Sequence, residues 1–126
     1  MSRLTTIRPE EATGAAAEMF AKIKKAVGKV PNAYATVGTH SPEALGAALA
    51  FDAAVAASTL GKADIEVIKL AVSEYVGCDY CIAAHTLMAK LAGLSGDDMK
   101  QVRAGVATGD AKRDALVTYV RTLVGT

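Results

Sequence analysis

The segment 63-ADIEVIKLAVSEYVGCDYCIAAH-85 contains two helix-forming stretches that meet at Gly77. Before this glycine, apolar residues recur at three- and four-residue steps, which is typical of a helix with one buried face, and they predict a helix over about 63–76. Gly77 suits the end of that helix. A second helix is predicted from about Cys78 to Ala92. The apolar stripe of the first helix comprises Ile65, Ile68, Val72 and Tyr75 or Val76.

The sequence on both sides of this segment also predicts helices, and no stretch alternates polar and β-branched residues as a half-buried strand would. Pro9 suits the first position of a helix that runs to Val27. We therefore expect an all-α fold, in which residues 1–126 form a single compact domain of about six or seven short helices. The predicted helices begin at Pro9, within 29–39, at Pro42, at Ala63, at about Cys78, after Ser95 and at Asp110.

Composition excludes several function classes. The chain has 126 residues, 14 basic and 13 acidic, so its formal net charge is +1 and it lacks the basic surface of a nucleic-acid-binding protein. No apolar run approaches the roughly 18 to 20 residues of a membrane span, and the start MSRLTTIRPEE lacks the apolar core of a signal peptide. We expect a soluble, cytoplasmic protein. Its mean hydropathy of +0.26 favours an oligomer that buries part of the apolar surface.

Two cysteines and a histidine gather at the start of the second helix. On a helix that includes Cys78, the side chain of Cys81 lies about 60° behind it and that of His85 about 20° behind it, so all three share one face and a disulfide is plausible. A helix N-terminus stabilises a thiolate, and His85 is suited to accept the thiol proton. This pattern favours redox chemistry. Two buried core thiols, or a zinc site of Cys78, Cys81 and His85, remain as alternatives, and His40 is the only other histidine.

A histidine that acts as a base works better when a carboxylate orients it. Glu66 and Glu74 are the candidates. Glu66 shares its helix face with small or apolar residues, where a solvated carboxylate has little reason to lie, although Lys69 could draw it into a surface pair. Glu74 lies near the helix end, where solvent is expected. The pattern favours Glu66.

Glu66, Cys78, Cys81 and His85 follow one another with eleven, two and three residues between them. In this spacing the chain resembles the alkylhydroperoxidase D-like branch of the carboxymuconolactone decarboxylase-like family. The similarity covers roughly residues 28–124, with the signature at 63–93. It implies an all-α fold that assembles as homotrimers or homohexamers.

The resemblance also implies a thiol-dependent peroxidase for small hydroperoxides. Glu66 and His85 would relay a proton from Cys81, which attacks the peroxide, and Cys78 would then close the disulfide. An external dithiol donor, such as a lipoyl- or thioredoxin-type carrier, would reduce the pair again, with no cofactor and no metal. The order of the two thiols stays open from the residues alone, because a position nearest the helix start favours Cys78 as the more reactive one.

The chain departs from the pattern at one position, since the best-known peroxidases of this branch carry a histidine where this chain has Tyr80. Lactone decarboxylases of the same fold lack the CxxC pair, so that activity is disfavoured. The alternatives to a peroxidase are a disulfide reductase or redox adaptor, and a non-redox module that binds zinc or acts as a helical oligomer. Tyr34, Tyr75, Leu87 and Met88 are candidates to line a pocket, but core packing is the expected role of each.

Overall fold

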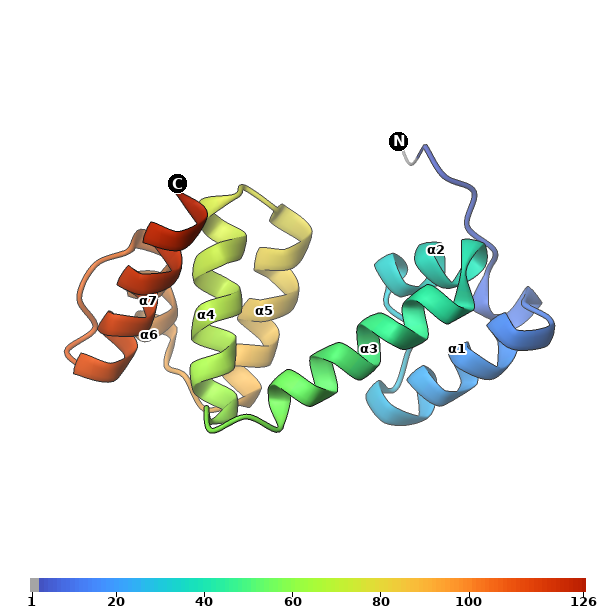
Figure 1. Ribbon diagram of the computed structural model, residues 1–126, viewed down its shortest axis with the longest axis horizontal. Coiled ribbons are helices and arrows are strands. Elements are labelled where there is room, and N and C mark those ends of the chain that lie inside the picture. The colour runs from blue at the N-terminus through green and yellow to red at the C-terminus, as the bar shows by residue number, and fades with distance from the viewer. Residues whose placement is uncertain (1–2) are drawn as a thin grey trace. The chain divides into compact units, whose positions relative to one another are not determined.

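The computed structural model describes residues 3–126, which form seven α-helices and one short 3-10 helix and contain no strand (Figure 1). The all-α fold class and the number of helices are confirmed. Contacts divide the chain into two compact units, Met1–Val55 and Ala56–Thr126. That residues 1–126 act as one domain stays a prediction. The elements are η1 (Pro9–Glu11), α1 (Gly14–Val27), α2 (Asn32–His40), α3 (Pro42–Ala56), α4 (Lys62–Tyr75), α5 (Asp79–Leu91), α6 (Gly96–Ala104) and α7 (Ala111–Val124).

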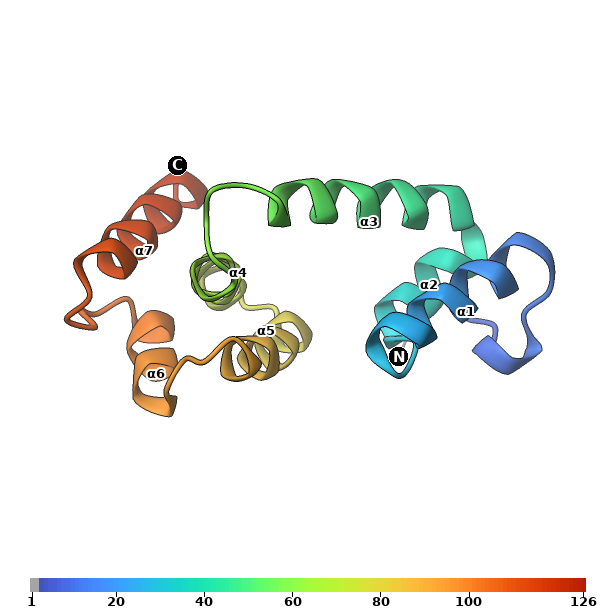
Figure 2. The same cartoon turned by 90° about the horizontal axis from the view of Figure 1, so that it is seen from below.

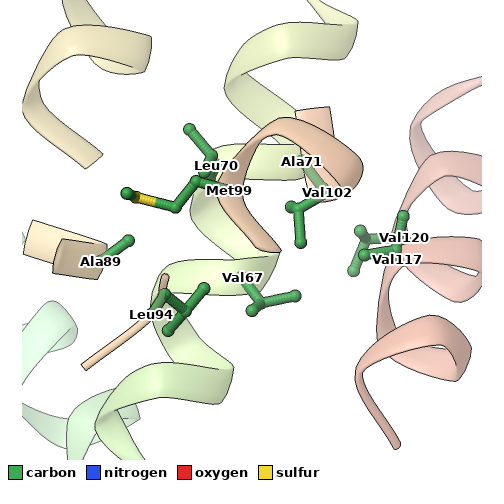
Figure 3. Close-up of a cluster of buried hydrophobic side chains, with 9 residues drawn as sticks. All are labelled: Val67, Leu70, Ala71, Ala89, Leu94, Met99, Val102, Val117 and Val120. Carbon is green, nitrogen blue, oxygen red and sulfur yellow. The ribbon is translucent and has the colours of Figure 1, made fainter. Parts of the chain in front are cut away.

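The second unit is built around α4, which contacts α5, α6 and α7. Figure 2 shows α4 end-on, with α5 on one side and α7 on the other. Val67, Leu70 and Ala71 of α4 are fully buried and form the face that packs in the core. Figure 3 shows them among the other core side chains, which are Ala89, Leu94, Met99, Val102, Val117 and Val120. The predicted stripe is therefore wrong as the core face: of its members only Ile65 is buried, Ile68 and Val72 are half-buried, and Tyr75 and Val76 are exposed.

The start of α4 is tied to α7 by an ion pair. Asp64 accepts a hydrogen bond from the backbone N–H of Gly61 at 3.3 Å, and its carboxylate lies 2.6 Å from Nζ of Lys112. The hydrogen bond from Lys112 is the main cause that holds the pKa of Asp64 below its ordinary value. This contact fixes the first turn of the helix that carries Glu66.

The first unit has a smaller core in which α1, α2 and the start of α3 meet. Phe20, Ile23 and Leu45 are buried there, and Tyr34 packs against them, as predicted. The prediction that Pro9 opens a helix running to Val27 is wrong. Pro9 starts only the 3-10 helix, because Ala12 and Thr13 are extended and α1 begins at Gly14.

Several large apolar side chains lie on the surface. The prediction of core packing is wrong for Tyr75, Leu87 and Met88, which are 44%, 58% and 46% exposed. In α3 the residues from Ala47 to Ala56 are exposed except Leu49, and Phe51 is 72% exposed. Across residues 3–126, none of the helices has the length and apolar character that crossing a bilayer requires.

Candidate active site

Gly77 and Cys78 form the junction between α4 and α5. Gly77 has a φ of +68°, its N–H donates to the carbonyl of Glu74 at 3.2 Å, and the N–H of Cys78 donates to the carbonyl of Ser73 at 3.0 Å. These two hydrogen bonds make the Schellman motif that ends many helices at a glycine. The sequence predicted this stop, and the motif also fixes the backbone position of Cys78.

Cys78 is the N-cap of α5 rather than its first residue. Its backbone is extended, with φ −90° and ψ 91°, and its Sγ accepts a hydrogen bond from the N–H of Cys81 at 3.3 Å. The two side chains form a disulfide, with Cα atoms 5.3 Å apart. The predicted helical angle between them is therefore wrong, because an N-cap side chain folds back over the first turn instead of projecting from the helix. Both cysteines are half-buried.

His85 follows Cys81 by four residues, so the two side chains lie one turn apart on the same face of α5. Nδ1 of His85 donates to Oε2 of Glu66 on α4 at 2.9 Å. The Glu66 side chain is 11% exposed and that of His85 is 26% exposed. A buried carboxylate is costly without a partner, so this hydrogen bond both satisfies Glu66 and fixes the ring.

The other candidate residues lie elsewhere. Glu74 pairs with Nε of Arg103 on α6 at 2.7 Å, so the structure selects Glu66 as the acid beside the imidazole. His40 is on α2 in the first unit, where its Nε2 donates to the carbonyl of Thr5 at 2.9 Å. In the range 3–126 no group of three or more His, Cys, Asp and Glu side chains is arranged to hold a metal ion.

Exposed residues flank the disulfide, and apart from Asp79 and Gly77 they are large and apolar. Tyr75 and Val76 before the junction, and Tyr80 after it, are 44%, 61% and 48% exposed. An added Cβ at Gly77 would meet no atom within 4 Å. The arrangement therefore joins a sulfur pair that reagents can reach to a histidine oriented by a buried acid, which is suited to thiol chemistry with proton transfer.

Sequence reasoning missed two features of this site. It did not assign Cys78 as a cap, although a glycine directly before a polar or sulfur-bearing residue is a signal for a helix end followed by a new start. It also did not predict the ion pair between Glu74 and Arg103, which lies on a different helix. No local pattern marks that pair, because 29 positions separate the two residues.

Comparison of the sequence with known protein families gives one match. The sequence profile described as "Carboxymuconolactone decarboxylase family" matches residues 42–116, a range that contains all four site residues. Neither the curated proteins nor the solved structures gave a significant match to the chain.

The left-handed turn at Gly77 gives the first prediction. Gly77→Ala should lower the free energy of unfolding by about 1 to 2 kcal/mol, because a Cβ disfavours a positive φ even where space is open. Urea denaturation measures this. The matched control is Gly96→Ala at the start of α6, which also meets open space but has no positive φ, and it should be neutral or slightly stabilising. Equal effects of both substitutions would contradict the requirement for glycine at 77.

Proposed function

The chain belongs to the carboxymuconolactone decarboxylase family, and within that family we propose that it is a thiol-dependent peroxidase for small hydroperoxides. The observation that carries this proposal is the hydrogen bond between Glu66 and His85, one helical turn from a disulfide of Cys78 and Cys81. A core thiol pair would need no oriented imidazole beside it. The cysteines are also half-buried rather than sealed, so a small peroxide can reach them.

The first step is attack on the peroxide by Cys81. The thiol transfers its proton to the His85 ring nitrogen that does not contact Glu66, and the thiolate attacks one peroxide oxygen. An S–O bond forms, the O–O bond breaks, and the imidazolium protonates the departing alkoxide. The sulfur becomes a sulfenic acid and the peroxide becomes an alcohol. Glu66 holds the ring in place and stabilises its positive charge while it carries the proton.

The second step closes the disulfide. The Cys78 sulfur attacks the sulfenic sulfur, an S–S bond forms, the S–O bond breaks, and water leaves with the proton of the Cys78 thiol. The two Cα atoms are 5.3 Å apart, within the range of disulfides, so little backbone movement is needed. A dithiol donor then reduces the Cys78–Cys81 disulfide with two electrons and two protons, and the donor itself is oxidised to a disulfide. We place this cycle in the cytoplasm, where donor thiols stay reduced.

A disulfide reductase or redox adaptor is the second candidate, because the same sulfur pair can exchange with protein disulfides. The exposed junction at Gly77 favours it, since a protein partner needs more room than a peroxide does. Rates with a hydroperoxide and with a disulfide substrate, compared on one preparation, separate the two. A zinc-binding module is the third candidate, and metal analysis of the reduced protein tests it.

We also infer self-association. Two largely apolar surfaces are uncovered within their own units. One is formed by the exposed residues of α3 around Phe51, where Asp52 is the only charged side chain from Ala47 to Ala56. The other is the outer face of α5 beside the exposed Lys90, with Leu87, Met88 and Leu91 58%, 46% and 73% exposed. Exposed apolar patches of this kind mark interaction sites. A second copy of the chain brings the same largely apolar surfaces and so can cover both, as a homotrimer or homohexamer would.

Loss of the attacking thiol should stop turnover. Cys81→Ser is expected to consume no hydroperoxide above background in the presence of a dithiol. With no dithiol added, Cys78→Ser should still reduce about one equivalent and then stop as a sulfenic acid, because neither a partner sulfur nor a donor thiol is present to remove it. Peroxide consumption and a sulfenic-acid trap measure this. A Cys81→Ser protein that turns over as fast as the parent would refute the proposal.

Loss of the orienting acid should slow the peroxide step. Glu66→Gln keeps the shape but removes the charge that stabilises the imidazolium, so we expect kcat to fall by about 100-fold. Glu74→Gln is the matched control on the same helix, because Glu74 pairs with Arg103 and not with His85, and its kcat should stay within about twofold of the parent. Equal losses in the two variants would mean that the effect is general destabilisation.

The assembly should depend on the outer face of α5. Sedimentation at micromolar concentration is expected to give a mass well above that of a monomer, and Leu91→Glu should shift it towards the monomer because it places a charge in the covered surface. Lys90→Glu, at an exposed neighbouring position, should leave the mass unchanged. A monomeric parent protein would contradict self-association.

A further inference from the structure

We propose that the dithiol donor attacks the disulfide at Cys78, so that the mixed disulfide with the donor forms on this sulfur while Cys81 handles the peroxide. This inference rests on the proposed dithiol cycle and adds to it the site of electron delivery. It assigns each cysteine a separate partner, as their different positions at the helix start suggest: Cys78 lies outside α5 and Cys81 lies within its first turn.

Access supports this assignment. Residues 75–77 before Cys78 and residues 79–80 after it are all exposed. The space beside Gly77 is empty to 4 Å around an added Cβ. Both sulfurs are half-buried, but after Cys81 only Ala83 is exposed, whereas Ile82, Ala84 and His85 are half-buried. A donor on a carrier is bulkier than a hydroperoxide, so it meets less obstruction at the chain turn than within the helix.

The leaving groups support it as well. Attack of the donor thiolate on Cys78 forms the new S–S bond, breaks the bond to Cys81, and releases Cys81 as a thiolate one turn from His85, which can return a proton to it. The Cys81 thiol is then back beside its base, ready for the next peroxide. Attack on Cys81 would instead leave the donor attached at the position that the peroxide must reach.

The second exchange returns Cys78. The other thiolate of the donor attacks the donor sulfur already bound, which closes the donor disulfide and expels Cys78 as a thiolate, so that two electrons have moved to the protein. The N–H of Cys81, which already lies 3.3 Å from Sγ of Cys78, can stabilise this thiolate. Asp79 is the acidic residue of the same first turn and opposes the negative charge, whereas Glu74 is neutralised by Arg103.

Single-cysteine variants test the assignment directly. The sulfur that the donor thiol attacks is also the sulfur that forms the mixed disulfide when the reaction runs in reverse. Cys81→Ser and Cys78→Ser are therefore each mixed with oxidised glutathione at pH 7, and the glutathione adduct is followed by mass. We expect Cys78, in Cys81→Ser, to react about tenfold faster than Cys81 does in Cys78→Ser. Equal rates, or a faster Cys81, would overturn the inference.

Two measurements separate this result from other causes. In concentrated urea both variants should react at similar rates, which shows that the difference comes from the fold; a difference that persists there would overturn the structural explanation. In the parent protein, brief reaction of the disulfide with glutathione followed by acid and trypsin should place the adduct mainly on Cys78 of the peptide 70–90, and adduct mainly on Cys81 would count against the inference.

The inference and the proposed function can fail separately. If the parent consumes hydroperoxide with a dithiol but the adduct lies on Cys81, the peroxidase proposal stands and the assignment of Cys78 is wrong. If the adduct lies on Cys78 but no hydroperoxide is consumed, Cys78 remains the sulfur of donor exchange and the peroxidase proposal is wrong.

Discussion

The left-handed backbone at Gly77 is the constraint on which the candidate site depends. Because Gly77 adopts a φ of +68°, the chain can end α4 with a Schellman motif and place the N-cap of α5 at the next residue. Cys78 therefore takes part in the end of one helix through its N–H and in the start of the next through its sulfur. Only three residues, 76–78, separate α4 from α5. This short connection limits which residues of the two helices can face each other.

Glu66 and His85 are such a facing pair. The Glu66 side chain is itself only 11% exposed, at the edge of the core, on a helix that contacts α5, α6 and α7. The rigid position of α4 matters for chemistry because a general base must be held close to one geometry. Packing of Val67 and Leu70 thus stabilises the acid, the acid orients the ring, and the ring lies one turn from Cys81.

The surface around this site differs in character from the site itself. The thiols and the imidazole are half-buried, whereas Leu87, Met88 and Leu91 on the outer face of the same helix are exposed. A helix that is apolar both towards the core and away from it needs contacts on both sides. The proposed self-association would supply the second set, and the route to the sulfurs would then run past the junction at Gly77 rather than across the outer face of α5.

Local patterns in the sequence predicted most of the helices, grouped Cys78, Cys81 and His85, and favoured Glu66 over Glu74. The stop at Gly77, the start after Ser95 and the spacing of Cys78, Cys81 and His85 all concern residues within a few turns of each other, where backbone geometry is fixed by near neighbours. The break before Gly14 and the cap role of Cys78 were missed, because both depend on the backbone angles of single residues that several sequences could adopt.

Tertiary structure decided the rest. Glu66 and Glu74 lie on one helix, and the packing of α5 against one part of α4 and of α6 against another pairs the first with His85 and the second with Arg103. The sequence likewise could not predict that Tyr75, Leu87 and Met88 are exposed. The same apolar residue on a helix can face the core of its own chain or the surface of a partner. Spacing along the chain determines which residues share a helix face; which faces meet depends on contacts between residues far apart in sequence.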